Sequence, residues 1–220
     1  MYKYIIQKET KINIRLKRLK AVIALALCSA FVLSESNTVS AYNASDAITY
    51  AKKYAEDPND AYDYMLRGDC TNFVSQCIKT GGKRNNYSTY KKRLGGKIEN
   101  TTKYWYYVGN AKKYAASTSW LRCSGAEGTF LGFWKNYSDY TTYSSIDAAR
   151  KNCKPGDVIQ LCDKDYKIRH SIICVKKKNK EIYCASHTGN YKSDSLEAIT
   201  TRAIKKDNYG SVKYLVYHFA

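Results

Sequence analysis

The pattern of apolar and polar positions predicts two helices early in the chain. Apolar residues recur at helical spacing over residues 47–55, behind capping side chains at residues 43–46, and again over residues 70–78. The second helix is expected to begin at Asp69 and to end at Gly81-Gly82, because glycine is typical of a helix C-terminus.

The middle of the chain gives a less regular pattern. Residues 83–103 are polar and contain Gly and Asn, which predicts a loop. Residues 104–121 are interpreted as a helix, and a further helix is expected around residues 130–134.

The last third has the short apolar runs that are typical of strands. Residues 158–162 follow a Pro-Gly turn and predict one strand, and residues 211–219 predict a closing strand. Between them, residues 170–176 and 181–187 flank a lysine-rich turn and predict a β-hairpin. Helices followed by antiparallel strands indicate an α+β fold.

The first 41 residues are predicted to be a secretory signal peptide. Seven Lys and Arg side chains precede an apolar run over residues 21–33, and the small residues Val39-Ser40-Ala41 follow, which is the order of a signal and its cleavage site. The apolar run has 13 residues, whereas a membrane-spanning helix needs about 20. The mature chain is therefore expected to begin at Tyr42 and to form a single domain, residues 42–220, with an uncleaved anchor as the alternative.

The mature chain is strongly basic. Residues 1–41 carry a net charge of +5, which leaves about +13 of the total of +18 for the remainder. A basic exported chain meets anionic wall polymers or phospholipid headgroups, although codon usage in an AT-rich genome explains the abundant lysine equally well. The charges are scattered as Lys-Lys pairs without a nucleic-acid motif, so nucleic acid is not an expected partner.

Cysteine usage indicates thiol chemistry more than a metal site. The predicted mature chain has an odd number of cysteines, so at least one thiol stays unpaired. No two have the C-x-x-C spacing of a zinc site, and no metal or cofactor is expected. The seven are Cys70, Cys77, Cys123, Cys153, Cys162, Cys174 and Cys184.

Cys70 stands at the start of the second predicted helix, directly after Gly68-Asp69. Unpaired N–H groups and the positive end of the helix dipole favour a thiolate at that place. The same N–H groups can bind the oxyanion that forms when an amide carbonyl is attacked, and Gly68 lets a substrate approach the backbone. Cys70 also fits the apolar stripe of its helix, so the residues alone leave a nucleophile and an ordinary core cysteine as equal alternatives.

Two histidines are candidates for the base that a cysteine nucleophile needs. A symmetric hairpin turn at Lys178-Asn179 places His170 directly opposite His187, so that one imidazole can orient the other. In that register Cys174 and Cys184 point to opposite faces of the sheet and form no disulfide with each other. Cys70 is expected to be the one thiol that iodoacetamide labels quickly near neutral pH.

These motifs resemble a known family. The decapeptide Gly-Asp-Cys-Thr-Asn-Phe-Val-Ser-Gln-Cys at residues 68–77 looks like the signature of the putative amidase domain family, among the papain-like cysteine hydrolases and beside CHAP and NlpC-type wall enzymes. The chain departs from the family at Gly189-Asn190, where the family often has an acid. Further similarities, over about residues 44–200, are residues 50–55, Thr80-Gly81-Gly82, Trp105, Trp120, residues 155–160, His170-Ser-Ile-Ile and Ser186-His187-Thr188.

The resemblance implies a papain-like α+β fold of the NlpC/CHAP type, with the nucleophile at a helix start and the N-terminal helices packed on a C-terminal antiparallel sheet. Cys70 is then the nucleophile, His170 the base and His187 the residue that orients His170. The Cys70 N–H supplies part of the oxyanion hole, with Tyr62 or Tyr64 as candidates for the second donor.

The sequence thus predicts a secreted or envelope-associated cysteine amidase or peptidase that hydrolyses amide bonds in cell-wall peptide stems. Expected partners are peptidoglycan peptides and anionic wall polymers, with no stable membrane insertion after cleavage, and the chain is expected to be a monomer. The alternative is a non-catalytic wall-binding or glycan-binding module on the same fold, whose basic surface, rich in its 22 tyrosines, holds the polymer.

Overall fold

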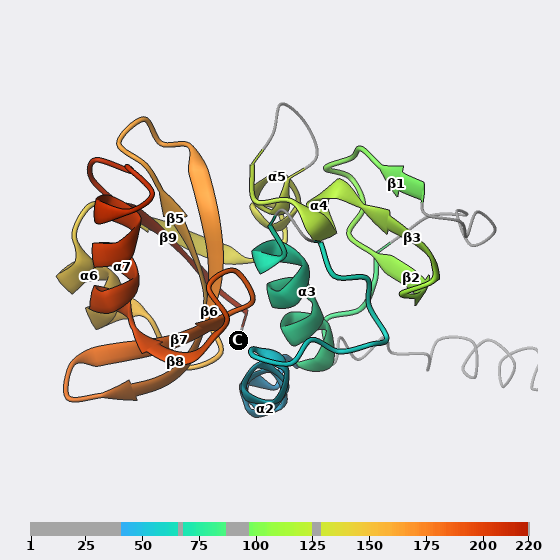
Figure 1. The fold of residues 1–220 in the computed structure, drawn as a ribbon, viewed down its shortest axis with the longest axis horizontal. Coiled ribbons are helices and arrows are strands. Elements are labelled where there is room, and N and C mark those ends of the chain that lie inside the picture. The colour runs from blue at the N-terminus through green and yellow to red at the C-terminus, as the bar shows by residue number, and fades with distance from the viewer. Residues whose placement is uncertain (1–40, 66–67, 87–96, 125–128, 220) are drawn as a thin grey trace, which may run out of the picture. The chain divides into compact units, whose positions relative to one another are not determined.

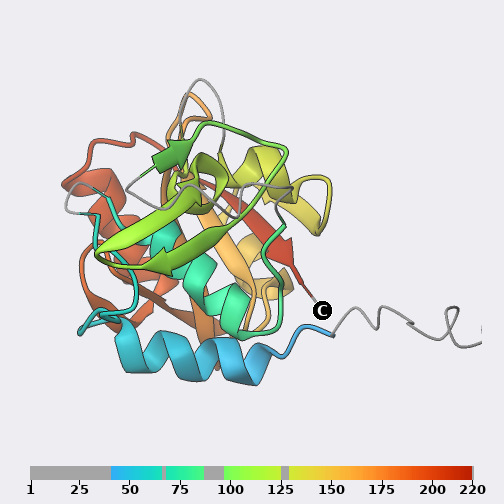
Figure 2. The same ribbon diagram turned by 90° about the vertical axis from the view of Figure 1, so that its right-hand side faces the viewer.

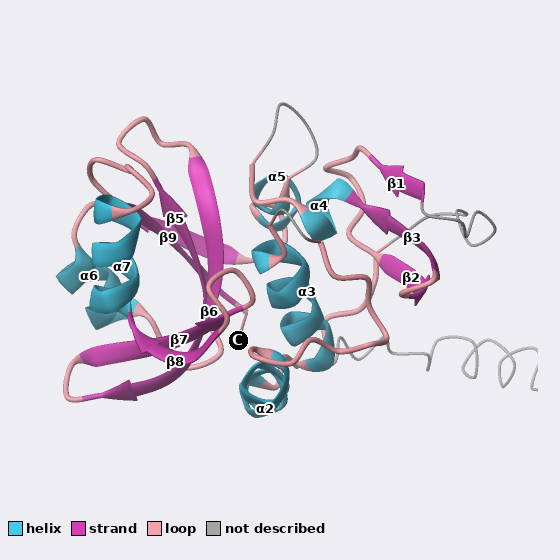
Figure 3. Cartoon of the chain, in the orientation of Figure 1, coloured by secondary structure: helices cyan, strands magenta, loops and turns pink. Residues whose placement is uncertain are grey.

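A six-stranded antiparallel sheet organises the second half of the protein. The computed structural model describes residues 41–65, 68–86, 97–124 and 129–219, and the predicted signal peptide lies outside them. The sheet has the order β4-β9-β5-β6-β7-β8, and each neighbouring pair is antiparallel (Figure 3). Its strands are β4 (Asp139–Tyr143), β5 (Val158–Cys162), β6 (Ile168–Lys178), β7 (Glu181–Ser186), β8 (Tyr191–Ser195) and β9 (Lys213–His218).

Helices cover both faces of this sheet (Figure 1). On one face lie α2 (Ala44–Tyr54) and α3 (Cys70–Thr80), the two helices that the apolar stripes predicted. On the other face lie α6 (Ile146–Asn152) and α7 (Leu196–Lys205). Together with the antiparallel strands, they give the α+β architecture that the sequence predicted.

A second, three-stranded sheet lies across α3 from the large sheet (Figures 1 and 2). It has the order β1-β3-β2, with β1 parallel to β3. The nearby short helices are α4 (Thr118–Leu121) and α5 (Phe130–Trp134), of which α5 was predicted. The strands are β1 (Lys97–Glu99), β2 (Tyr107–Asn110) and β3 (Lys113–Ser117).

The helix predicted over residues 104–121 is wrong, because most of this stretch is a β-hairpin. Gly109 has a φ of 102°, which a helix does not accommodate. The Asn110 side chain accepts hydrogen bonds from the N–H groups of Lys112 and Lys113, at 3.0 and 3.1 Å, and so forms the turn. The predicted loop over residues 83–103 contains β1, and its residues 87–96 lie outside the described part.

The predicted β6–β7 hairpin is confirmed, but its register is wrong. The turn lies at Asn179-Lys180, where both residues have positive φ (51° and 65°), as a two-residue hairpin turn requires. A bulge between Cys174 and Lys176 shifts the pairing again, so that Cys174 lies directly opposite Cys184. The predicted pairing of the two histidines therefore does not occur.

Two apolar cores lie on the two faces of the large sheet. The larger one joins the sheet to α2, α3 and the aromatic side chains of α4 and α5. The smaller one joins the sheet to α6 and α7. Among the described residues, no helix is long and apolar enough to span a bilayer.

Candidate active site

The N-terminus of α3 presents Cys70 as its first residue, in nearly complete burial with 5% of its surface exposed. Gly68, two residues earlier, has a φ of +136°, and the space that a side chain would occupy there is open. Asp69 is the N-cap residue, but its carboxylate accepts no capping hydrogen bond from the backbone N–H groups of the first turn. The N–H of Cys70, for which the described residues offer no partner, is thus available to a ligand.

His170 on β6 faces Cys70 closely enough to lower the pKa of its thiol. Its Nε2 atom is 2.6 Å from the hydroxyl oxygen of Tyr191 on β8, which leaves Nδ1 for the cysteine. Burial in an apolar setting raises the pKa of the Tyr191 phenol, so that its hydroxyl stays protonated. The tyrosine therefore holds the imidazole from behind without adding a charge.

The pKa of the Cys70 thiol is held well below its usual value although burial acts in the opposite direction. The largest cause is a hydrogen bond from the thiol of Cys123. A hydrogen bond and the charge of His170 come next, followed by the backbone N–H of Ser171. In return, the neighbouring Cys70 raises the pKa of Cys123, which therefore acts as a donor and not as a second thiolate. Cys70 has the partners of an activated nucleophile.

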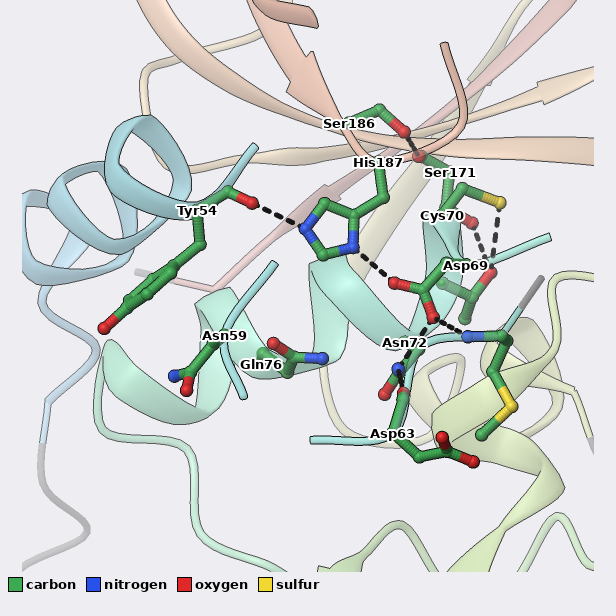
Figure 4. Close-up of polar contacts among 12 residues, drawn as sticks. Tyr54, Asn59, Asp63, Asp69, Cys70, Asn72, Gln76, Ser171, Ser186 and His187 are labelled. Atoms are coloured by element: carbon green, nitrogen blue, oxygen red, sulfur yellow. Dashed lines mark hydrogen bonds and ion pairs between the residues drawn. The ribbon is translucent and has the colours of Figure 1, made fainter. Parts of the chain in front are cut away.

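The hydrogen bonds of His187 run to Asp69 and Tyr54, and none of them reaches Cys70 (Figure 4). Its Nδ1 is paired with the Asp69 carboxylate, and its Nε2 is 2.6 Å from the carbonyl oxygen of Tyr54 at the end of α2. His187 thus connects Asp69 at the start of α3 to the backbone at the end of α2. The ring is 1% exposed and stacks on Phe73 at 4.2 Å.

Asp69 connects this pair to the chain around Cys70. Its Oδ1 atom accepts hydrogen bonds from the N–H of Met65 at 2.9 Å and from the side-chain amide of Asn72 at 2.8 Å. Its Oδ2 atom is paired with Nδ1 of His187. The carboxylate thus fixes the segment that enters α3, and His187 neutralises its charge within the core.

Two hollows meet at the turn that contains Thr188 and Gly189. One, of about 420 Å³, is lined by His170 and Tyr191 together with basic side chains of β6 and α7. The other, of about 350 Å³, is lined by Gly68, Asp69 and Tyr64. A substrate chain that crosses this turn would pass His170 in one hollow and Gly68-Asp69, which directly precede Cys70, in the other. A larger hollow, of about 720 Å³ between α6, α7 and the β6–β7 turn, is lined by none of these residues.

Of the residues predicted from the sequence, the structure brings Cys70 and His170 together and separates His187 from them. The prediction that His187 orients His170 is wrong, because the hairpin register on which it rested is shifted. Tyr62 also lies elsewhere, since its hydroxyl is 3.2 Å from the Lys79 ammonium nitrogen. Tyr64 remains at the rim of the smaller hollow.

Sequence reasoning missed Tyr191, Cys123 and the role of Asp69. Tyr191 stands one residue after Gly189-Asn190, where the departure from the family pattern was noted. Cys123 gave no signal, because its approach to Cys70 depends on the position of the segment that follows α4. Among the described residues, no three His, Cys, Asp or Glu side chains converge as metal ligands.

Comparison of the sequence with known proteins identifies its family. A family model described as a putative amidase domain matches residues 41–211. The chain belongs to the putative amidase domain family. At a coarse level, the description of this family gives amide hydrolysis as the reaction.

One curated relative is the uncharacterized protein YjcM of Bacillus subtilis (strain 168), which is 28% identical over 186 residues. The match covers 81% of this chain and 38% of the relative, so the chain spans well under half of that protein's length. No solved structure matches the chain.

Proposed function

We propose that this member of the putative amidase domain family is an exported cysteine amidase or peptidase that cleaves amide bonds in cell-wall peptides. Cys70 is the nucleophile and His170 the general base. The place of Cys70 as the first residue of α3, with His170 beside it lowering the pKa of its thiol, is the observation that carries the proposal.

The proposed reaction begins with the Cys70 thiolate and a protonated His170. The sulfur attacks the amide carbonyl, and the negative charge that develops on oxygen is stabilised by the N–H of Cys70. His170 gives its proton to the leaving amine, and an acyl-enzyme remains on the sulfur. Water, deprotonated by His170, then attacks the thioester carbonyl and releases the acid, which restores the Cys70 thiolate and the protonated His170.

Tyr191 takes the orienting role that the sequence had given to His187. Its hydroxyl, 2.6 Å from Nε2 of His170, holds the ring so that Nδ1 faces the sulfur. A neutral phenol stabilises an imidazolium less than a carboxylate does, so the pair depends mainly on the thiolate for its charge balance. His187 becomes a positioning residue that fixes Asp69 and the start of α3.

The decisive experiment is the release of new amines from purified peptidoglycan by residues 42–220. Wild type should release amines, and Cys70→Ala should release none above background. The matched control is Cys77→Ala, which removes a fully buried cysteine from the same helix and should retain activity. Mass spectrometry of the released fragments identifies the bond that is cut.

The competing function is a non-catalytic wall-binding module. It predicts that the protein sediments with peptidoglycan without releasing amines, and that Cys70→Ala binds as the wild type does. That combination would refute the catalytic proposal.

Export is tested separately. N-terminal sequencing of the secreted protein should give Tyr42 as the first residue, since cleavage is expected after Val39-Ser40-Ala41. A protein that stays in the membrane with residues 1–41 attached would refute the signal peptide and leave the catalytic proposal intact.

A further inference from the structure

A row of buried polar side chains crosses the large sheet and ends at the nucleophile. The Tyr217 hydroxyl on β9 is 2.6 Å from Oε1 of Gln160 on β5, and Nε2 of Gln160 is 3.0 Å from the hydroxyl oxygen of Ser171 on β6. Ser171 is in turn 2.9 Å from the hydroxyl oxygen of Thr71. Thr71 lies 3.8 Å from the sulfur of Cys70.

None of these polar groups is accessible to water. Tyr217, Gln160, Ser171 and Thr71 all have an exposed fraction of 0%. Their neighbours on the same face of the sheet, such as Val158 and Ile173, are apolar core residues. Buried polar groups destabilise a fold unless they are hydrogen-bonded, so a connected row of four in an apolar core calls for a function.

The chemistry of each group gives the row a direction. The amide nitrogen of Gln160 can only donate, so the Ser171 oxygen accepts from it. Ser171 keeps its own proton, which it can donate to the Thr71 oxygen at 2.9 Å. In this direction Thr71 accepts one hydrogen bond from Ser171. Its own proton is then free for the next acceptor, the sulfur of Cys70.

We propose that Thr71 is a positioning residue for the nucleophile, and that a one-way chain of hydrogen bonds beginning at Tyr217 holds its hydroxyl proton on the sulfur of Cys70. The chain favours the thiolate, because a thiolate accepts this proton and a thiol competes for it. Its role in catalysis rests on the proposed function, whereas its effect on the sulfur does not.

Other groups face the same sulfur and set the background against which Thr71 acts. His170 contributes from β6, and Cys123 donates from the segment after α4. Tyr191 on β8 and Tyr209 after α7 are close enough for the Cys70 charge to raise the pKa of both phenols. Cys70 raises the pKa of the Cys123 thiol more than Thr71 lowers it, so Cys123 keeps its proton.

The test measures the rate at which iodoacetamide alkylates Cys70 as a function of pH, with mass spectrometry of the Cys70 peptide. Thr71→Val removes the hydroxyl at nearly constant volume and should raise the midpoint of the profile by about one pH unit. Thr71→Ser retains the hydroxyl and should leave the midpoint unchanged. The matched control is Thr80→Val at the far end of α3, where the hydroxyl donates to the Gln76 carbonyl.

Unchanged midpoints in Thr71→Val would overturn the proposal. If this variant fails to fold by circular dichroism, Thr71→Ala removes the same hydroxyl with a smaller side chain and has the same expected result. Ser171→Ala tests the direction, because a reversed chain would free the Thr71 proton for Cys70 and lower the midpoint. A lowered midpoint would therefore also contradict the proposal.

None of these measurements requires turnover. If peptidoglycan is not cleaved while Thr71→Val still shifts the midpoint, the proposed function fails and the hydrogen-bond chain stands. If peptidoglycan is cleaved and the midpoint does not move, the chain fails and the cysteine hydrolase stands.

Discussion

Two groups of cysteines, on opposite faces of the large sheet, differ in what surrounds them. Cys70 and Cys123 meet at the N-terminus of α3. Cys153, Cys174 and Cys184 meet in the apolar core beneath α6 and α7. All five are free thiols, and all three of the second group have an exposed fraction of 0%.

A lowered pKa does not by itself distinguish the two groups. Hydrogen bonds from Cys153 and Cys184 lower the pKa of Cys174 to about 4, and the Cys70 pKa is also lowered. Of these five, only Cys70 has a histidine that lowers its pKa, a place at a helix N-terminus, and a hollow lined by the two residues that precede it. A cysteine nucleophile therefore needs a base and a path for the substrate in addition to an acidic thiol.

The largest difference between the groups should appear in turnover. Cys70→Ala and His170→Ala should each lower kcat/KM on a wall peptide by about 10³-fold or more, and by similar amounts, because nucleophile and base act as a unit. Cys184→Ala should leave kcat/KM within a few-fold of wild type. An inactive Cys184→Ala that is still folded would remove the distinction between the two groups.

Alkylation should separate the groups by about 10²-fold in rate, because the reagent must reach the sulfur. Cys70 should react with iodoacetamide near pH 7, while Cys174 reacts only after denaturation. Because the Cys70 pKa is lowered in the folded protein, its rate should stay high as the pH falls below the ordinary thiol value of about 8.5 and drop only at more acidic pH. Faster labelling of Cys123 or Cys153 than of Cys70 would contradict this.

Loss of the His187–Asp69 pair at the start of α3 should have an intermediate effect on activity. His187→Ala removes the donor to Oδ2 of the buried Asp69 carboxylate and the donor to the Tyr54 carbonyl, which should lower the free energy of unfolding by about 3–5 kcal/mol. Activity should fall about tenfold through loss of the helix start, and His187→Gln should recover part of both losses because its amide can still donate. Urea unfolding and kcat/KM measure the two effects.

The control for the His187–Asp69 pair is His218→Ala. His218 lies on β9 and is hydrogen-bonded to the carboxylate of Asp157. His218 is 28% exposed on its side chain, so its loss should cost about 1 kcal/mol. Equal destabilisation by the two variants would show that His187 has no special place. A His187→Ala variant as inactive as His170→Ala would return His187 to the catalytic site.

The elements with a regular apolar period could be predicted from the sequence, as α2, α3 and β5 show. The residues 104–121 could not, because two aromatic-rich strands and a short helix place apolar side chains at intervals that also suit one helix. Gly109-Asn110 was the local signal for the turn.

In the site, Cys70 and His170 followed from motifs within single elements. The partners of each histidine did not, since they depend on strand register, and one residue of shift in the turn plus a bulge at Val175 changed which side chains face each other. Tyr191, Cys123 and Thr71 reach the site only through the packing of elements that are far apart in the sequence.

The smallest of the expected effects concerns how His170 is held. Tyr191→Phe removes the hydroxyl that is 2.6 Å from Nε2 and retains the ring that fills the core. The imidazole keeps its contact with the sulfur through Nδ1 but loses its fixed orientation, so kcat/KM should fall about threefold to tenfold with little change in KM. The pH dependence of kcat/KM, measured alongside, reports the altered thiolate–imidazolium pair.

Tyr209→Phe is the matched control, because Tyr209 lines the same hollow and no hydrogen bond of its hydroxyl is found among the described residues. Wild-type kinetics in Tyr191→Phe would show that the hydroxyl does not orient the base, and a loss as large as that of His170→Ala would show that it takes part in proton transfer.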